Sequence, residues 1–164
     1  MSTVLSKDRK VPELKILKQA EALLEMTCKV YNDESKLPKR QRPLIGARTV
    51  NNIYDVYENL RLANEIFPDS KSNINIRLDA AKQAYISANK FCSDINVLPY
   101  AINCDSNARW YLEMNKCATE LATGTKNWMN SDRRRMNNRL STINTEYNKP
   151  VKAIIFIDKD KTKK

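Results

Sequence analysis

Hydrophobic residues recur every three or four positions in four long stretches of the chain, and polar segments containing proline, aspartate or asparagine separate these stretches. This spacing places the hydrophobic side chains on one face of an α-helix. We therefore expect four amphipathic helices, at about residues 12–32, 41–67, 72–96 and 105–139. The third is expected to end before Pro99, because the residue before a proline disfavours the helical conformation. Asp105 or Ser106 is the expected N-cap of the fourth.

Each predicted helix carries a hydrophobic stripe. In the first, heptad spacing selects Leu14, Leu17, Glu21, Leu24, Cys28 and Tyr31, and Leu23, Met26 and Val30 widen the stripe. We expect five residues of the second and fourth helices to pack in the core or at a subunit contact: Ile53, Leu60, Trp110, Leu121 and Trp128. The heptad spacing of the two tryptophans favours this packing over base stacking.

Four helices joined by short or moderate connections predict an all-α fold, an antiparallel up-down-up-down four-helix bundle. We expect a disordered arm at residues 1–11, the bundle at 12–139 and a basic, flexible C-terminal tail at 140–164. The strand pattern is confined to residues 151–157. The apolar run 153–157 is either a sticky tail segment or a strand that adds to the sheet of a partner.

The composition argues against several classes of enzyme. The chain has no histidine, so it lacks the usual proton shuttle at neutral pH and the commonest metal ligand. Its two glycines, Gly46 and Gly124, cannot form a phosphate-binding glycine loop. The four cysteines (Cys28, Cys92, Cys104 and Cys117) lack the spacing of a zinc site. Cys28, Cys92 and Cys117 lie in hydrophobic stripes and are typical of small buried hydrophobic residues in a reducing compartment. We expect no catalytic residues, no metal and no cofactor.

The positive charge is concentrated near the C-terminus. The chain has 29 Lys and Arg against 19 Asp and Glu, and residues 132–164 carry 10 basic and 4 acidic residues. Such an excess favours polyanionic partners, of which nucleic acid is the commonest, although a basic surface can also serve solubility alone.

Two basic clusters are candidates for nucleic-acid contact. The first lies at the start of the second predicted helix and the second at the end of the fourth, so a monomeric bundle places them at opposite ends. Arg133–Arg135 could instead complement the negative end of the helix dipole, but three consecutive arginines exceed that need. Arg48 lies close to the apolar face and could pair with a carboxylate instead of a phosphate. The candidate residues are Lys39, Arg40, Arg42, Arg48, Arg133, Arg134, Arg135 and Arg139.

Two motifs resemble those of a known group of proteins. Residues 37–48 read LPKRQRPLIGAR, and residues 124–131 read GTKNWMNS. They resemble the opening of the second helix and the end of the last helix in bacterial four-helix-bundle proteins. That group includes the accessory variability determinant proteins of diversity-generating retroelements and proteins encoded in ribosomal RNA intervening sequences.

The resemblance implies a positively charged, barrel-like homopentamer that binds a reverse transcriptase and its RNA and supports mutagenic cDNA synthesis. In that family the chemistry belongs to the polymerase. The resemblance would give scaffold and basic-surface roles to Pro38, Lys39, Arg42, Gly46, Arg48 and Trp128. Residues 140–164 and Pro43 depart from the short members of the group.

We therefore expect a non-enzymatic, oligomeric protein that binds RNA, and possibly DNA, together with a reverse transcriptase. The alternative is a protein-only assembly factor of the intervening-sequence type, and an enzyme with an Asp/Glu metal site is disfavoured. Residues 1–10 lack the apolar core of a signal peptide, and residues 153–157 are too short to span a membrane. We expect a cytoplasmic protein with no membrane contact.

Overall fold

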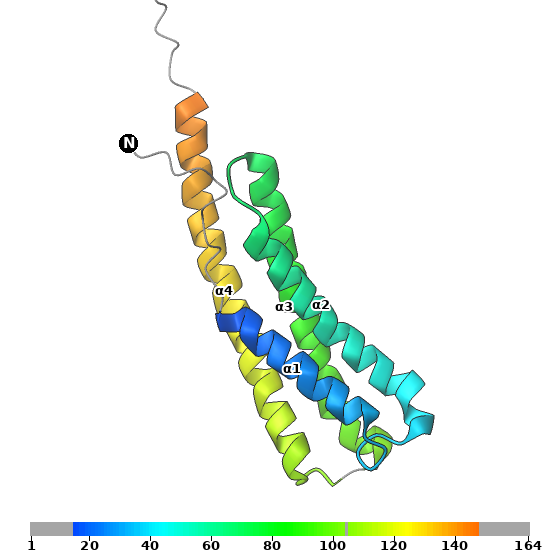
Figure 1. Cartoon of the computed structure of the whole chain (residues 1–164). Coiled ribbons are helices and arrows are strands. Elements are labelled where there is room, and N and C mark those ends of the chain that lie inside the picture. The colour runs from blue at the N-terminus through cyan, green and yellow to red at the C-terminus, as the bar shows by residue number, and fades with distance from the viewer. Residues whose placement is uncertain (1–14, 104, 148–164) are drawn as a thin grey trace, which may run out of the picture.

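The computed structural model describes residues 15–103 and 105–147, which form an all-α four-helix bundle, as the hydrophobic pattern predicts (Figure 1). The described residues contain no strand. The helices are α1 (Lys15–Asn32), α2 (Ala47–Glu65), α3 (Lys71–Ile102) and α4 (Arg109–Tyr147). The expected arm at 1–11, Cys104 and the apolar run 153–157 lie outside the described residues.

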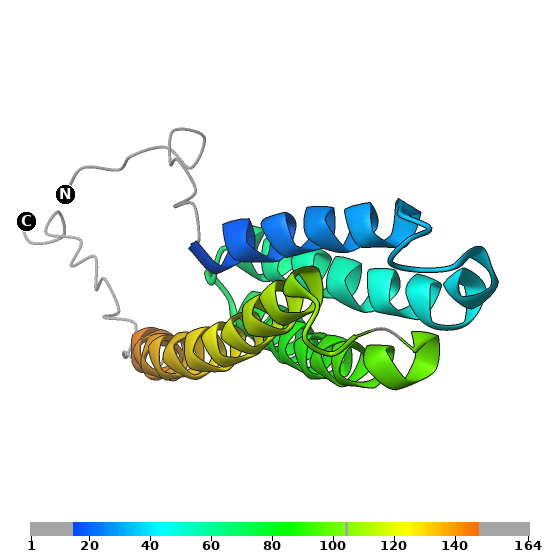
Figure 2. The ribbon, with the colours of Figure 1, turned by 90° about the horizontal axis from the view of Figure 1, so that it is seen from below.

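Each helix packs against the next along the chain, and α4 returns to α1. The bundle has two ends: the α1–α2 loop end, which also holds the α3–α4 connection, and the α2–α3 loop end, toward which α4 runs (Figures 1 and 2). Helix α1 has 18 residues and α4 has 39, so α1 covers only part of the length of α4. Beyond the start of α1, the described bundle continues as the three helices α2, α3 and α4 (Figure 1).

The chain enters α2 through two irregular turns. A 3-10 turn spans Lys39–Gln41, and a π-helical turn spans Arg42–Gly46. Pro43 lies in the first positions of the π turn, where its missing N–H costs no hydrogen bond. Regular α-helix therefore begins at Ala47, six residues later than the pattern predicts.

Helix α3 is longer than the sequence predicts. Its N-cap is Ser70, whose hydroxyl accepts a hydrogen bond from the Asn73 N–H at 3.2 Å. The expected end before Pro99 is wrong, because the helix passes Pro99 and ends at Ile102, with Asn103 in the left-handed conformation at φ 51°. Leu98 is buried and Ile102 packs on the core, so packing offsets the hydrogen bond that a proline removes.

Helix α4 begins later and ends later than expected. It starts at Arg109, and the Asp105 carboxylate accepts the Asn107 N–H at 2.8 Å in a turn that precedes the helix. Neither Asp105 nor Ser106 is its N-cap. The helix continues to Tyr147, so residues 140–147, which we assigned to the tail, extend α4.

The buried side chains form two clusters. The larger lies where all four helices meet and contains Ile53, Leu60, Phe91, Ile95 and Leu121. The smaller lies toward the α2–α3 loop end and consists of Ala63, Ala80, Ala81 and Met129. Trp128 packs against both clusters.

The expected stripe of α1 is confirmed at Leu23 and Val30 and is displaced at the heptad positions. The buried residues are Ile16, Ala20, Leu23, Thr27 and Val30, whereas Glu21 is exposed and Leu17, Leu24 and Cys28 are half-buried. Heptad counting selected a seam with a charged residue, and the true seam includes alanine and threonine, which the hydrophobic pattern underweights. In α2 the prediction is confirmed for Ile53 and Leu60, and Thr49, Val56 and Ala63 complete the buried face.

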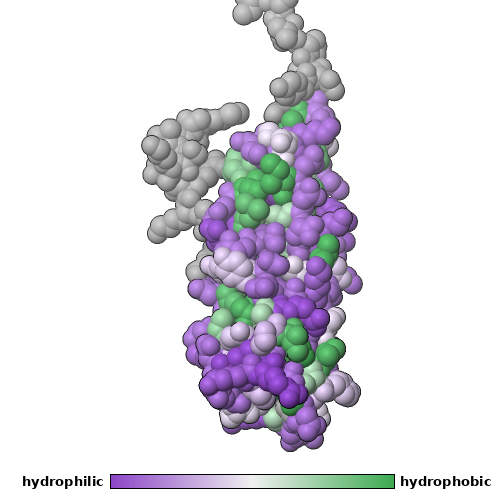
Figure 3. Space-filling view, turned by 90° about the vertical axis from the view of Figure 1, so that its right-hand side faces the viewer, coloured by the Kyte–Doolittle hydropathy of each residue, from purple (hydrophilic) through white to green (hydrophobic). Residues whose placement is uncertain are grey.

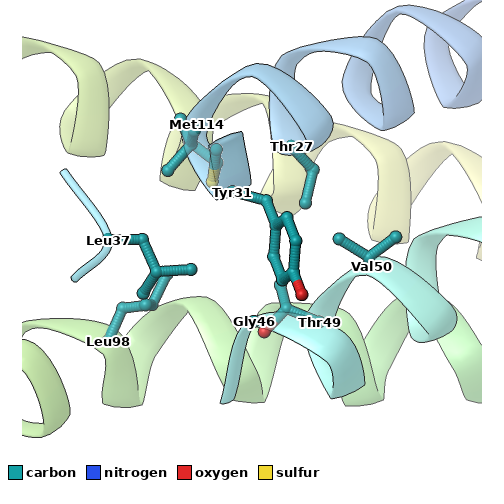
Figure 4. A pocket seen from close by; sticks show the side chains of 9 residues that line it. Thr27, Tyr31, Leu37, Gly46, Thr49, Val50, Leu98 and Met114 are labelled. Atoms are coloured by element: carbon teal, nitrogen blue, oxygen red, sulfur yellow. The ribbon is translucent and has the colours of Figure 1, made fainter. Parts of the chain in front are cut away.

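Both glycines allow close approach between helices. A Cβ at Gly46 would lie 2.6 Å from Tyr31 Cδ2 and 2.7 Å from Leu37 Cδ2. Figure 4 shows Tyr31 and Leu37 beside Gly46 around a small apolar cavity of about 20 Å³. A Cβ at Gly124 would lie 2.6 Å from Ile16 Cδ1, the flexible end of a side chain.

Within the described residues, no helix has an apolar stretch long enough to cross a bilayer.

We predict that Gly46→Ala lowers the free energy of unfolding by about 1–3 kcal/mol, because a methyl group would press on the rigid Tyr31 ring. The backbone at Gly46 is helical, with φ −60° and ψ −48°, so the effect is steric. Gly124→Ala is the matched control. The gain of about 1 kcal/mol in helix propensity offsets a movement of Ile16, which predicts a change below about 1 kcal/mol. Urea unfolding of both variants measures the difference, and equal destabilisation would contradict this account.

Candidate nucleic-acid interface

The basic residues at the α1–α2 loop end are mostly paired within the fold. Lys39 lies 2.8 Å from Glu34, and Lys36 lies 2.9 Å from Asp33. The Ser35 hydroxyl and the Lys36 ammonium lower the pKa of Asp33 to about 2. These acidic groups reduce the positive field at this end of the bundle.

Arg42 holds the end of α1. Its Nη2 donates a hydrogen bond to the Asn32 carbonyl at 3.1 Å, and its Nε donates to the Leu37 carbonyl at 3.3 Å. Its guanidinium carbon lies 5.7 Å from the centroid of the Tyr31 ring. The Arg42 side chain is therefore used by the connection between α1 and α2.

Arg48 pairs with a carboxylate, which is one of the two alternatives that the sequence left open. Its Nη2 lies 2.6 Å from Asp94 Oδ1, and Asn52 Nδ2 donates a hydrogen bond to Asp94 Oδ2 at 2.6 Å. Asp94 is buried in α3, so the pair joins α2 to α3. An open groove of about 830 Å³ runs beside the pair, lined mainly by polar residues of these two helices. Among the described residues, Arg40 is the member of the first cluster that has no partner.

The second basic cluster lies at the other end of the molecule, toward the C-terminus of α4 (Figures 1 and 2). Residues 109–124 of α4 contain two basic and two acidic side chains, whereas residues 125–147 contain five basic and two acidic ones. The net charge of α4 therefore comes entirely from its C-terminal part. One of the two acidic residues there, Asp132, is fully buried.

Asp132 is the centre of an ion-pair network that the sequence analysis missed. Arg77 of α3 binds it with two hydrogen bonds, from Nε to Oδ2 at 2.7 Å and from Nη2 to Oδ1 at 2.9 Å. Arg77 Nη1 also donates to the Ile66 carbonyl at 3.1 Å. Arg135 adds a hydrogen bond from Nη2 to Asp132 Oδ1 at 3.1 Å. The network joins α3, α4 and the α2–α3 connection.

A signal for this network is present in the sequence. Asp132 follows Leu121, Thr125 and Trp128 at three- and four-residue steps, so it continues the buried face of α4. A carboxylate on a buried face needs a charged partner. The pairing residue, Arg77, could not be identified without the register of α3 against α4.

Arg139 also serves the fold. Its Nε donates to the Pro68 carbonyl at 3.1 Å, and its guanidinium carbon lies 6.0 Å from the centroid of the Phe67 ring. The α2–α3 connection is thus held against α4 by Arg77 and Arg139.

Arg133 and Arg134 are the remaining residues of the second basic cluster. Both are exposed, and neither has an ion-pair or hydrogen-bond partner in the part of the chain that the structure describes. Lys126, seven residues before Arg133 and on the same flank of α4, is also exposed without such a partner there. The eight predicted residues therefore do not form one patch. The structure divides them into five residues with a partner in the fold and three, Arg40, Arg133 and Arg134, without one among the described residues.

The five predicted packing residues are placed as follows. Ile53, Leu60 and Leu121 are buried in the larger cluster, whereas Trp110 and Trp128 are half-buried and pack against it. Trp110 meets Tyr111 edge to face, with ring centroids 6.1 Å apart. The Trp128 Nε1 is buried and has no hydrogen-bond partner among the described residues.

Cys92 and Cys117 do not have the surroundings of activated nucleophiles. Burial raises the pKa of the Cys92 thiol, and burial together with Glu120 and Glu113 raises that of Cys117. A raised pKa leaves less of the thiolate, which is the reactive form. Cys28, Cys92 and Cys117 are half-buried instead of fully buried as the pattern suggested. Among residues 15–103 and 105–147, no group of three or more Cys, Asp or Glu side chains is placed to hold a metal ion.

Comparison of the chain with known protein families, curated proteins and solved structures gives no match.

We predict that Asp132→Asn lowers the free energy of unfolding by about 3–5 kcal/mol, because it leaves the nearly buried Arg77 guanidinium without its counter-charge. Arg77 is 11% exposed and Asp132 is 0% exposed. Arg135→Gln is the control. It removes the outer partner, whose side chain is 60% exposed, so we expect a loss of at most about 1 kcal/mol. Chemical denaturation followed by circular dichroism measures both changes, and a small effect of Asp132→Asn would show that the network is dispensable.

Proposed function

We propose that this chain is a non-enzymatic nucleic-acid-binding four-helix bundle and that its contact surface is the outer side of α4, residues 125–147. The observation that carries the proposal is the unpaired state of Arg133 and Arg134. The fold uses Arg42, Arg48, Arg77 and Arg139 for its own contacts, but it makes no such use of these two within the described residues. Planar guanidinium groups that face solvent are suited to phosphate oxygens.

The resemblance described above supports a more specific proposal. It suggests RNA and a reverse transcriptase as partners, in a homo-oligomer whose repeated basic surfaces would act together on one polyanion. Several motif residues have scaffold roles in this fold. Arg42 binds backbone carbonyls, Gly46 lies against Tyr31, and Trp128 packs between the two clusters. These roles are compatible with a bundle that supports the chemistry of a partner polymerase.

We predict that Arg133→Glu/Arg134→Glu weakens binding of a labelled RNA hairpin or DNA duplex by at least about tenfold at low salt. The slope of log affinity against log salt concentration should fall by roughly 1 to 2, because each lost phosphate contact contributes about 0.7–0.9. Arg135 is left in place because it pairs with Asp132. The matched control, Lys82→Glu/Lys90→Glu, makes the same change in net charge on exposed positions of α3.

Fluorescence anisotropy across a salt series provides the measurement. If the two double variants lose affinity equally, binding depends on net charge and not on this surface. If the unmodified protein binds neither probe at low salt, the proposed function is wrong.

A specific observation favours a second candidate, a protein-only assembly factor. Figure 3 shows hydrophobic side chains gathered in separate areas on the α2–α3 side of the molecule. The large exposed hydrophobic residues include Leu62, Phe67 and Ile76 near the α2–α3 connection, and Tyr100 is 88% exposed at the other end of α3. Such areas are typical of protein interfaces. Light scattering with and without RNA separates the two candidates, since a salt-reversible gain in mass requires nucleic acid.

A further inference from the structure

The outer face of α4 changes in character halfway along the helix. Residues 109–124 contain one asparagine, whereas residues 125–147 contain five. All five are exposed, and their side-chain amides have no hydrogen bond to any described residue. They are Asn127, Asn130, Asn137, Asn138 and Asn144.

Between residues 125 and 144, this face carries no exposed carboxylate. Between residues 125 and 144 the acidic side chain is that of Asp132, which points into the bundle and is bound by Arg77. Asn127, Asn130, Arg134 and Asn138 follow one another at steps of three and four residues, so they form one row. The row borders a hollow of about 380 Å³ that Ser131 and Arg135 complete.

The amides are not explained by helix stability. Asparagine is less favourable than alanine in a helix by up to about 0.7 kcal/mol, and these five make no compensating contact within the described fold. An amide offers a donor and an acceptor side by side, and a guanidinium offers two parallel donors. Those are the groups that read the edges of bases in nucleic acid.

The geometry points to one class of nucleic acid. An α-helix fits the wide major groove of B-form DNA, whereas the major groove of A-form RNA is too deep and narrow for side chains to read. Proteins bind single strands mainly by stacking bases on aromatic side chains. Trp128, the aromatic residue of α4 between positions 125 and 144, packs against the hydrophobic clusters instead.

We propose that the outer face of α4 binds in the major groove of duplex DNA, with the row Asn127, Asn130, Arg134 and Asn138 toward the base edges. Lys126 and Arg133 share one flank of this row and are placed to contact phosphates. The proposal rests on the proposed function, that this surface binds nucleic acid, and it names duplex DNA in place of the RNA that the resemblance suggests.

The first test compares three labelled probes of one sequence: a DNA duplex, an RNA duplex and a DNA single strand. The sequence is obtained by selection from a random DNA duplex pool with the full chain. We expect the DNA duplex to bind at least about tenfold more tightly than the other two. Equal or tighter binding of the RNA duplex or the single strand overturns the inference and leaves the proposed function intact. Binding to none of the probes overturns the proposed function itself.

The second test separates base contacts from phosphate contacts. Asn130→Ala/Asn138→Ala should reduce discrimination between the selected duplex and a scrambled one by about tenfold, with an unchanged salt slope. Arg133→Gln should weaken both duplexes equally and lower the slope by about 1. The control Asn75→Ala/Asn96→Ala removes exposed amides from α3 and should change neither quantity. The alanine substitutions raise helix propensity, so a loss of discrimination is not explained by unfolding of the variant.

A pool that binds but yields no preferred sequence contradicts base reading. The same conclusion follows if the α4 and α3 asparagine variants behave alike. In either case the surface binds phosphates alone.

Discussion

The buried Asp132 carboxylate is the constraint on which the α2–α3 loop end of the bundle depends. A charge in a hydrophobic interior is tolerated when a counter-ion and hydrogen bonds surround it. Arg77 supplies two hydrogen bonds and Arg135 a third, so the three side chains fix the register of α3 against α4. Because Arg77 also binds the Ile66 carbonyl, the α2–α3 connection is positioned by the same group. The smaller hydrophobic cluster, of three alanines and Met129, lies between α2, α3 and α4, the helices that this network joins or positions.

At both ends of the molecule, the fold uses arginine for its own contacts. At the α1–α2 loop end, Asp33, Glu34 and Asp94 pair with basic side chains, and Arg42 binds carbonyl groups. In α4, Asp132 is the acidic residue between positions 125 and 144, and Arg77 binds it inside the fold. Counter-ions or phosphates can therefore approach Arg133 and Arg134 without competition from an exposed carboxylate of this segment of α4.

The fold class and the four helices could be predicted from the hydrophobic spacing, as could most of the buried face of α2. The boundaries could not, because packing of Leu98 and Ile102 carries α3 past Pro99 and because α4 continues where its hydrophobic pattern fades. The sequence also could not predict which of the candidate basic residues pair within the fold. Whether Arg42, Arg48 or Arg139 is paired within the fold depends on carbonyls and carboxylates that the chain brings near only when it folds. Arg48 illustrates this, since the sequence indicated a carboxylate as one possible partner but could not identify Asp94.

The unequal lengths of α1 and α4 have a consequence for how the molecule opens. Regions with few buried contacts exchange amide hydrogens through partial unfolding, at a lower free energy than the global transition. The three-helix part has a small cluster of its own, and Trp128 is the side chain that packs against both clusters. The four-helix part and the three-helix part are therefore coupled by the Trp128 side chain and by the continuous backbones of α2, α3 and α4. The C-terminal turns of α4 can loosen as a separate unit while the four-helix part stays closed.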